Sequence, residues 1–318
     1  MRKYVVTGGA GFIGSALVRG LLREGAARVV VIDNLLTGRL ENLAEVRGSI
    51  DFHRADIRHY EEIAPLLEGA GVVFHEAAIP SVPRSIADPV PSHEINIDGT
   101  FNVFRAAAAG KAGRVVYAAS SSAYGDTPVL PKVETMLPQP KSPYALQKLV
   151  GEYYASVFAS VFGLETVSLR YFNVFGPRQD PSSPYSGVLS LFIQAILERR
   201  SPIIYGDGEQ SRDFTYVEDV VALNLKAARA PGISGKCYNA GNGGRVTLNQ
   251  AWDLLQRFEG VSLPARYGPP RPGDVRDSQA DTVAAVRDLG HAPGYSFEQG
   301  LRLTLEWYKE QRGPSSSS

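Results

Sequence analysis

Tyr144 and Lys148 are a pair of residues whose types and spacing can do chemistry. They lie in the heptapeptide SPYALQK, residues 142–148. Residues four apart lie on the same face of a helix, one turn from each other. A tyrosine has a pKa of about 10 and is a poor base by itself, but a nearby ammonium group stabilises the phenolate and lowers that pKa. The alternative is an ordinary pair of neighbours on an exposed helix face, so other residues must decide.

A glycine-rich turn follows the first apolar run of the chain. The segment YVVTGGAGFIG, residues 4–14, predicts a strand, a tight turn and the start of a helix. It contains the spacing Gly9-x-Gly11-x-x-Gly14, and Gly8 offers a second register. Glycines at such positions let the backbone approach a pyrophosphate at the helix N-terminus. The pattern predicts a dinucleotide site, and a turn that serves only close packing is the alternative.

Asp33 ends the second predicted strand, about twenty residues beyond the glycine turn. A carboxylate at this place can accept hydrogen bonds from both hydroxyls of an adenosine ribose. The same negative charge repels a 2′-phosphate, which favours NAD over NADP as the cofactor. Arg39 is too far along the chain to reverse that preference by itself.

Three serines bring the opening pair into the same site. Ser120, Ser121 and Ser122 follow the fifth predicted strand, at the edge where sheets of this kind bind ligands. With Lys148 and the positive nicotinamide of NAD nearby, Tyr144 can exchange a proton with a substrate hydroxyl. Ser120 can hold the same oxygen by a hydrogen bond. The sequence therefore favours a reactive Ser–Tyr–Lys set over a surface helix pair.

The segments that position these residues alternate between two patterns. Short runs rich in β-branched residues are separated by longer amphipathic stretches, which indicates a parallel sheet covered by helices on both faces. Right-handed connections then give a doubly wound α/β fold. The predicted strands are 3–7, 28–33, 51–55, 71–77, 114–120 and 164–170, and the predicted helices between them are 12–24, 59–68, 94–109 and 143–162.

After about residue 174 the chain becomes richer in proline and glycine. This part predicts a smaller α/β substrate-binding subdomain with helices at 188–199, 247–258 and 297–311. We expect a nucleotide-binding domain over 1–173, with about 213–242 returning to its sheet, and the second subdomain over 174–212 and 243–312. The low-complexity end GPSSSS, residues 313–318, predicts a disordered tail.

The composition argues against several classes of function. The 318 residues are 44% hydrophobic and 21% charged, which is ordinary for a soluble globular protein. Acidic and basic residues balance at 33 each, which argues against a nucleic acid or an anionic membrane as the main partner. Cys237 is the one cysteine and the five histidines show no ligand spacing, so no metal site is predicted. No apolar run approaches the ~20 residues of a membrane span, and we expect a cytoplasmic protein.

Together the motifs resemble the extended short-chain dehydrogenase/reductase superfamily, in its NAD-dependent sugar-nucleotide epimerase/dehydratase branch. The resemblance runs along nearly the whole chain, through TGGAGFIG, NIDGT, SSSAYG, SPYALQK, LRYFNVFGPRQ, GDGEQSRDFTYVEDV and RPGDVRDSQAD. It implies a Rossmann fold, with Tyr144 as the base, Lys148 as its partner and Ser120 as a hydroxyl donor. The residues that it implies for NAD binding are Gly8, Gly11, Phe12, Ile13, Gly14, Asp33, Asn34, Asp56, Ile57, Ala77, Ala78, Asn96, Tyr144, Lys148 and Tyr171.

The two residues after Ser120 distinguish reactions within this branch. Its dehydratases follow the corresponding serine or threonine with an Asp-Glu pair that protonates and removes a hydroxyl group. Here Ser121 and Ser122 stand in those places and cannot do that work. The resemblance therefore implies epimerisation, in which tightly bound NAD oxidises C4 of the sugar and the hydride returns to the opposite face of the 4-keto sugar.

The resemblance also implies a UDP-sugar as the substrate. Two arginines, Arg212 and Arg271, suit a pyrophosphate through charge-assisted hydrogen bonds. The alternative is that these charges form salt bridges at a subdomain interface. For Arg84 a pyrophosphate contact and a structural role are equally open. The residues implied for the substrate are Ser120, Ser121, Tyr144, Asn173, Arg178, Gln179, Arg212, Arg271, Asp274 and Ser278.

Ser278 bears on the identity of the sugar. Related 4-epimerases restricted to glucose and galactose tend to carry a tyrosine at the corresponding position, and those that accept N-acetylhexosamines carry a small residue. Ser278 leaves room for a 2-acetamido group, so we expect interconversion of UDP-GlcNAc and UDP-GalNAc, with UDP-Glc and UDP-Gal as a further pair.

Three alternatives stay open, namely a UDP-glucose 4-epimerase alone, a UDP-glucuronate 4-epimerase, and a non-catalytic NAD or sugar-nucleotide sensor. The resemblance also implies a homodimer through a four-helix bundle built from the predicted helices 94–109 and 143–162.

Overall fold

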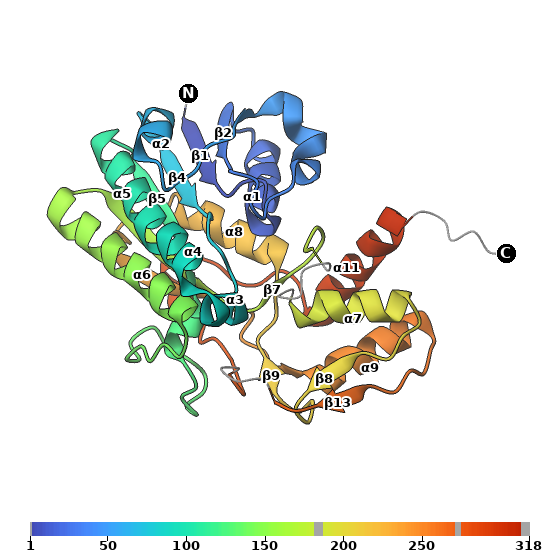
Figure 1. The fold of residues 1–318 in the computed structure, drawn as a ribbon. Helices are drawn as coiled ribbons and strands as arrows, with labels where there is room; N and C mark the ends of the chain where they lie inside the picture. Colours follow the sequence, from blue (N-terminus) through green and yellow to red (C-terminus); the bar gives the residue numbers. More distant parts are fainter. Residues whose placement is uncertain (1, 181–186, 271–274, 313–318) are drawn as a thin grey trace.

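The computed structural model describes residues 2–180, 187–270 and 275–312. Its main element is a parallel sheet of seven strands: β1 (Lys3–Thr7), β2 (Arg28–Ile32), β3 (Asp51–His53), β4 (Val72–His75), β5 (Arg114–Ser120), β6 (Glu165–Tyr171) and β11 (Lys236–Ala240). Their order across the sheet is β11-β6-β5-β4-β1-β2-β3. Helices cover both faces (Figure 1), which confirms the predicted doubly wound α/β fold.

Helices occupy the connections between these strands. Around the sheet lie α1 (Phe12–Arg23), α2 (Tyr60–Leu67), α3 (Val82–Ala87), α4 (Pro89–His93), α5 (Thr100–Ala109), α6 (Pro143–Phe162) and α8 (Val217–Ala227), with the 3-10 helices η1 (Leu40–Ser49) and η3 (Ser121–Tyr124) and a π-helical turn, η2 (Glu94–Gly99). The remaining helices are α7 (Val188–Leu197), α9 (Leu248–Glu259), α10 (Val283–Leu289) and α11 (Phe297–Arg312).

Short strands complete the C-terminal part. They are β7 (Val174–Phe175), β8 (Ile203–Tyr205), β9 (Ser211–Arg212), β10 (Thr215–Tyr216), β12 (Val246–Thr247) and β13 (Arg266–Gly268), and they pair two by two. Helices α7, α9 and α11 gather beside β8 and β13, at the end of the molecule away from the large sheet (Figure 1). Between these segments the chain returns to the sheet, because α8 leads to β11, which pairs parallel with β6.

Helix α6 begins and ends where the sequence predicts, because both ends carry local stop signals. The Ser142 side chain accepts a hydrogen bond from the Ala145 backbone N–H, and Pro143 occupies the first helical position. Gly163 ends the helix in the left-handed conformation with φ 68°. Tyr144 therefore lies in the first turn of α6, close to the carboxyl edge of the sheet.

The predicted helix 94–109 differs from the structure at its start. Helical structure begins earlier, at α4, because the Asp88 side chain accepts a hydrogen bond from the Val90 backbone N–H. The wide turn η2 then precedes α5. In this turn Asn96 is buried, and its side chain bonds both the N–H and the carbonyl of Ile79 at 2.8 and 3.2 Å. The turn thus ties the segment after β4 to the helical layer.

The close packing of α6 on β5 depends on a helix position without a side chain. Gly151 faces the ring of Tyr117 in β5, and a Cβ atom at residue 151 would overlap that ring and its hydroxyl. The Tyr117 hydroxyl donates a hydrogen bond to the Lys148 carbonyl at 3.2 Å. This contact sets the distance between α6 and β5. It therefore also sets how far Lys148 lies from the strand.

Among the described residues, no helix is long and apolar enough to cross a membrane.

We predict that Gly151→Ala destabilises the protein by about 1–3 kcal/mol, because the added methyl group overpacks the α6–β5 contact. Urea unfolding followed by circular dichroism measures this change. Gly48→Ala is the matched control, since nothing lies within 4 Å of a Cβ at that position, and it should stay within about 0.5 kcal/mol of the unchanged protein. Equal stability of the two variants would contradict the packing argument.

Candidate functional site

A cavity of about 1510 Å³ runs along the carboxyl edge of the sheet and continues against the C-terminal part. It exceeds the about 300–1,000 Å³ that is typical of a site for one small molecule. Most of the predicted site residues line it: Gly8, Gly11, Phe12, Ile13, Gly14, Asp33, Asn34, Ile57, Ala77, Ala78, Ser120, Ser121, Tyr144, Lys148, Tyr171, Asn173, Arg178, Gln179, Arg212 and Ser278. One cavity thus joins the predicted nucleotide and reactive residues.

The glycine turn forms a cradle of bare backbone at one end of the cavity. Gly8 has φ +68°, and a Cβ there would lie 2.7 Å from the backbone of Ala77. A Cβ on Gly14 would overlap the carbonyl oxygen of Gly8. Helix α1 begins at this turn without a side-chain cap, so its first N–H groups face outward. This arrangement fits a dinucleotide pyrophosphate.

Asp33 is held in place beside the cradle by two backbone donors. Its Oδ2 accepts from the Ala10 N–H at 2.9 Å, and its Oδ1 accepts from the Leu35 N–H at 2.8 Å. Burial raises the pKa of Asp33, and the two hydrogen bonds act in the opposite direction. Each carboxylate oxygen keeps a further lone pair for a ligand hydroxyl.

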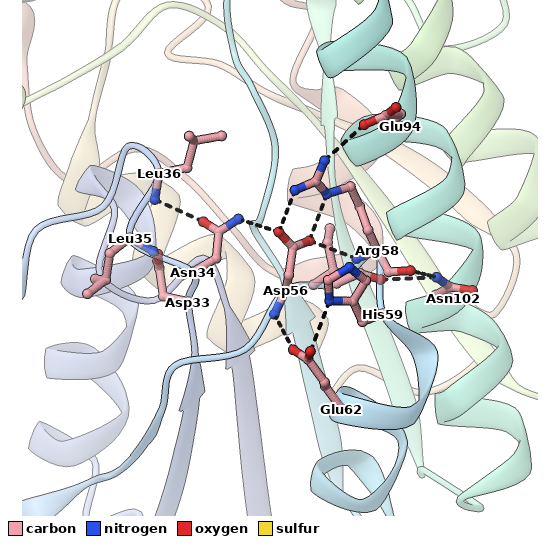
Figure 2. A network of polar contacts seen from close by, with 11 residues as sticks. Asp33, Asn34, Leu35, Leu36, Asp56, Arg58, His59, Glu62, Glu94 and Asn102 are labelled. Carbon is pink, nitrogen blue, oxygen red and sulfur yellow. Dashed lines mark hydrogen bonds and ion pairs between the residues drawn. The ribbon is translucent and has the colours of Figure 1, made fainter.

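Asn34 lines this end of the cavity and belongs, with Asp56, to a polar network (Figure 2). The Asn34 amide donates to Asp56 Oδ2 at 2.8 Å, and Arg58 pairs with the same carboxylate at 2.9 Å. Although burial acts to raise the pKa of Asp56, the hydrogen bonds from Arg58 and Asn34 lower it to about 2. Asp56 does not itself line the cavity, whereas its neighbours Ala55 and Ile57 do.

Asn96 also lies behind the wall rather than on it. Its amide donates to Gln147 Oε1 on α6 at 2.9 Å, in addition to its two bonds with Ile79. Ala77 and Ala78, which precede Ile79, form part of the cavity wall. The structure therefore gives Asn96 a place from which it orients the wall and the reactive helix together.

Ser120, Tyr144 and Lys148 converge in the middle of the cavity. Ser120 Oγ accepts hydrogen bonds from the Ser122 N–H at 3.2 Å and from the Ser122 hydroxyl at 2.8 Å. Because a hydroxyl oxygen has two acceptor sites, these bonds leave the Ser120 hydrogen free to be donated. Lys148 Nζ donates to the Ala118 carbonyl at 2.8 Å, which fixes the ammonium beside the end of β5.

The pKa of Tyr144 is shifted in the direction opposite to the one that a nearby ammonium group would produce. Burial raises the pKa of Tyr144, and an interaction with Ser120 offsets part of this increase. Burial lowers the pKa of Lys148 to about 8, against the attraction of Glu76 and Glu152.

Asn173 and Ser278 meet at the far end of the cavity, where the C-terminal part closes over the sheet. The Asn173 amide donates to Ser278 Oγ at 3.1 Å and to the Asp213 carbonyl at 3.2 Å. The Ser278 oxygen also accepts from the Asp213 N–H at 3.3 Å. Ser278 is a small residue and is 9% exposed, so its side chain takes up little of the space in the cavity at this place.

The predicted arginines occupy different parts of the cavity wall. Arg212 donates to the Arg276 carbonyl at 2.8 Å, and Arg178 pairs with Glu45 at 2.8 Å. Arg84 lines the cavity as well. The predicted substrate residues Arg271 and Asp274 lie outside the described residues.

Sequence reasoning missed several residues of the wall. Trp307 and Tyr308 of α11 line the cavity, and Tyr308 donates a hydrogen bond to the Gln179 carbonyl. Their helix pattern carries no functional signal, because their rings also pack like core aromatics. Glu76 lines the cavity too, directly after β4. Its position at the carboxyl end of a predicted strand was the signal that could have identified it.

Comparison with known proteins agrees with this geometry. Residues 4–241 match the profile of the NAD dependent epimerase/dehydratase family. A relative from Methanocaldococcus jannaschii, described as a putative UDP-glucose 4-epimerase, is 37% identical over 307 residues, which are 96% of this chain and 98% of the relative.

Two solved structures share the fold over nearly the whole chain. One is a UDP-N-acetylglucosamine 4-epimerase from Methanobrevibacter ruminantium in complex with UDP-N-acetylmuramic acid, with a TM-score of 0.93, 38% identity, and coverage of 98% of this chain and 99% of that chain. The other is a UDP-glucose 4-epimerase from Thermotoga maritima with UDP-glucose, with a TM-score of 0.93, 37% identity and the same coverage. The predicted family and its cofactor, NAD, are confirmed, and the chain belongs to the NAD dependent epimerase/dehydratase family.

Proposed function

We propose that the protein is a UDP-sugar 4-epimerase that interconverts UDP-GlcNAc and UDP-GalNAc, with UDP-Glc and UDP-Gal as a further pair. The observation that carries this proposal is the convergence of Ser120, Tyr144 and Lys148 in a cavity that also contains the glycine cradle. The 4-epimerases among the similar proteins support the reaction type.

In the proposed reaction Tyr144 accepts the proton of the C4 hydroxyl and later returns it. NAD, when bound, supplies the reversible two-electron oxidation of the sugar carbon. Ser120 donates its hydroxyl hydrogen to the same sugar oxygen, since its own acceptor sites are taken by Ser122. Lys148 holds a positive charge one helical turn from Tyr144 and favours its phenolate form once a second positive charge is present in the cavity.

The serines after β5 favour epimerisation over dehydration. Ser121 and Ser122 begin the short helix η3, and the Ser122 hydroxyl is committed to Ser120. Neither is a carboxylic acid that can protonate a leaving hydroxyl group. We therefore assign no elimination step to this site.

We further propose roles for the residues at the far end of the cavity. Residues 174–212 and 243–312 form the UDP-sugar-binding part. Asn173, directly before it, contacts the sugar, and Arg178, Gln179 and Arg212 contact the diphosphate and nucleoside. Ser278 is small because a 2-acetamido group has to fit beside it. The Ser278 hydroxyl already accepts a hydrogen bond from the Asn173 amide. Recognition of the sugar therefore depends on the space beside Ser278 and on the orientation that Ser278 gives to the Asn173 side chain.

The homodimer remains a prediction, and the exposed apolar residues of α5 and α6 support it. Phe101, Tyr153, Val157, Val161 and Phe162 are between 39% and 69% exposed on these two helices. Side chains of this size on adjacent helices suit a four-helix bundle with a second copy of the chain.

We predict that Tyr144→Phe lowers kcat by about 10²–10⁴-fold, because the variant cannot exchange the proton of the C4 hydroxyl. Epimerisation is followed by NMR of the UDP-sugar products, and retention of bound NAD is followed by its absorbance after denaturation. Tyr60→Phe in α2 is the matched control and should keep the rate of the unchanged protein. An unimpaired rate in Tyr144→Phe would rule out this mechanism, whereas a cellular function left untouched by Tyr144→Phe would favour the sensor alternative.

We predict that Ser278→Tyr lowers kcat/KM for UDP-GlcNAc by about 10–200-fold while UDP-Glc is spared, because the ring fills the space for the acetamido group. The measurement is the product spectrum with both sugars offered in parallel. Ser278→Ala keeps the space and should keep the acetylated substrate. If Ser278→Tyr leaves the preference between the two sugars unchanged, the pocket argument fails. If the unchanged protein turns over UDP-glucuronate alone, UDP-glucuronate replaces the proposed substrate.

A further inference from the structure

Glu76 is a buried carboxyl group in the cavity that the proposed mechanism does not use. It follows directly after β4, at the carboxyl edge of the sheet, and precedes the Ala77 backbone that closes on the glycine cradle. Part of its surface is exposed, and that part faces the cavity, which it lines together with Lys148 and Tyr171. An ionised carboxyl group in such a place costs free energy unless its charge is paired or hydrogen-bonded.

Two donors arranged in sequence fix the orientation of Glu76. The Asn224 amide on α8 donates to the Tyr171 hydroxyl oxygen at 2.8 Å and to the Val220 carbonyl at 2.9 Å. The Tyr171 hydroxyl in turn donates to Glu76 Oε1 at 2.6 Å. Because Asn224 supplies a hydrogen to the tyrosine oxygen, the tyrosine hydrogen is free to point at Glu76. This chain of donors suits an ionised carboxylate as its acceptor.

The charges around Glu76 are unevenly compensated. Glu152, the other carboxylate that attracts Lys148, is committed to Arg170 through a pair at 2.7 Å. Burial raises the pKa of Glu76 to about 7, against the effects of the Tyr171 hydrogen bond and the Lys148 charge. Glu76 is therefore a carboxyl group whose ionisation responds to a further positive charge in the cavity.

A positively charged ring has to enter this part of the cavity. In the proposed function the nicotinamide of NAD has to reach the sugar carbon whose oxygen Ser120 and Tyr144 would hold, so the ring would occupy the cavity that Glu76 and Lys148 also line. The oxidised ring carries one positive charge and the reduced ring carries none. A fixed negative charge nearby thus distinguishes the two redox forms.

We propose that the Glu76 carboxylate, oriented by Tyr171 and Asn224, stabilises the oxidised, positively charged nicotinamide over the reduced, neutral one. One cycle of the proposed reaction moves two electrons and a proton from the sugar to the ring and returns them, so no outside oxidant resets the cofactor. A bias towards the oxidised form keeps the sugar-free enzyme ready for the next substrate. The proposal rests on the cofactor part of the proposed function and not on the identity of the sugar.

The test is the midpoint potential of the cofactor bound to the intact protein. The holoenzyme is equilibrated with a reference redox couple, and the reduced nicotinamide is read by its absorbance. Glu76→Gln keeps an oxygen acceptor for Tyr171 and removes the charge. We expect the affinity ratio of NAD⁺ to NADH to fall about tenfold, which equals a rise of about 30 mV for a two-electron couple.

Two further variants make the result interpretable. Glu76→Met is also neutral and of similar volume, so it carries the test if Glu76→Gln does not fold, and it should shift the potential in the same direction. Glu61→Gln removes an exposed carboxylate of α2 and should leave the potential unchanged. Thermal unfolding checks that each variant is folded, and absorbance checks that it keeps its bound cofactor.

The possible outcomes separate this proposal from the proposed function. An unchanged potential in the folded Glu76 variants would overturn the role of Glu76 while leaving the epimerase proposal intact. A loss of turnover at Glu76→Gln without a shift in potential would likewise overturn it, in favour of a structural or proton-transfer role. If the unchanged protein bound neither NAD⁺ nor NADH, the proposed function itself would fail.

Discussion

The contact between Gly151 and Tyr117 is the constraint on which the geometry of this site depends. Helix α6 can approach β5 closely only because residue 151 has no side chain. The short distance brings Lys148 within 2.8 Å of the Ala118 carbonyl and keeps Tyr144 beside the serines that end β5. A helix held farther from the sheet by even one methyl group would lift Tyr144 away from the serines at the end of β5. The arrangement of Ser120, Tyr144 and Lys148 is therefore a property of helix packing before it is a property of the three residues.

Burial then determines which charges this packed site can carry. Lys148 has its pKa lowered to about 8, and it keeps much of its positive charge because two carboxylates attract it. Glu152 also pairs with Arg170, in a bidentate pair buried between α6 and β6. The charge of Lys148 is thus balanced by carboxylates of the protein rather than by solvent. A charged cofactor that entered the cavity would change this balance.

The sequence predicts the parts of this structure that have local causes. Ser142, Pro143 and Gly163 mark the two ends of α6, and the runs of β-branched residues mark the strands. The start of helix 94–109 was predicted wrongly. The Asp88 cap is a local signal that was overlooked, whereas the wide turn at η2 is tied to a separate segment of the fold by the hydrogen bonds between Asn96 and Ile79.

The candidate site shows the same division between local and long-range causes. The glycine turn, Asp33 and Ser120 occupy the cavity wall because strand ends and turns place them there. Asn96 matches the same family motif but lies behind the wall, since a motif does not state how far a side chain is from a ligand. Glu76 was missed for the opposite reason. Its significance depends on Tyr171 and Asn224, which join it from strands and helices far along the chain.

The return of the chain to the large sheet at β11 affects how the protein can be synthesised. Strand β6 is complete at residue 171, but the strand that covers its outer edge is not made until residue 240. In between, the ribosome adds α7, the short strands β7 to β10 and α8. For that interval the seven-residue strand β6 presents unpaired N–H and carbonyl groups along one edge, the kind of edge that recruits other chains. Nascent protein cut short between these two points would be prone to aggregation, because the sheet edge that β11 covers in the longer chain is still open.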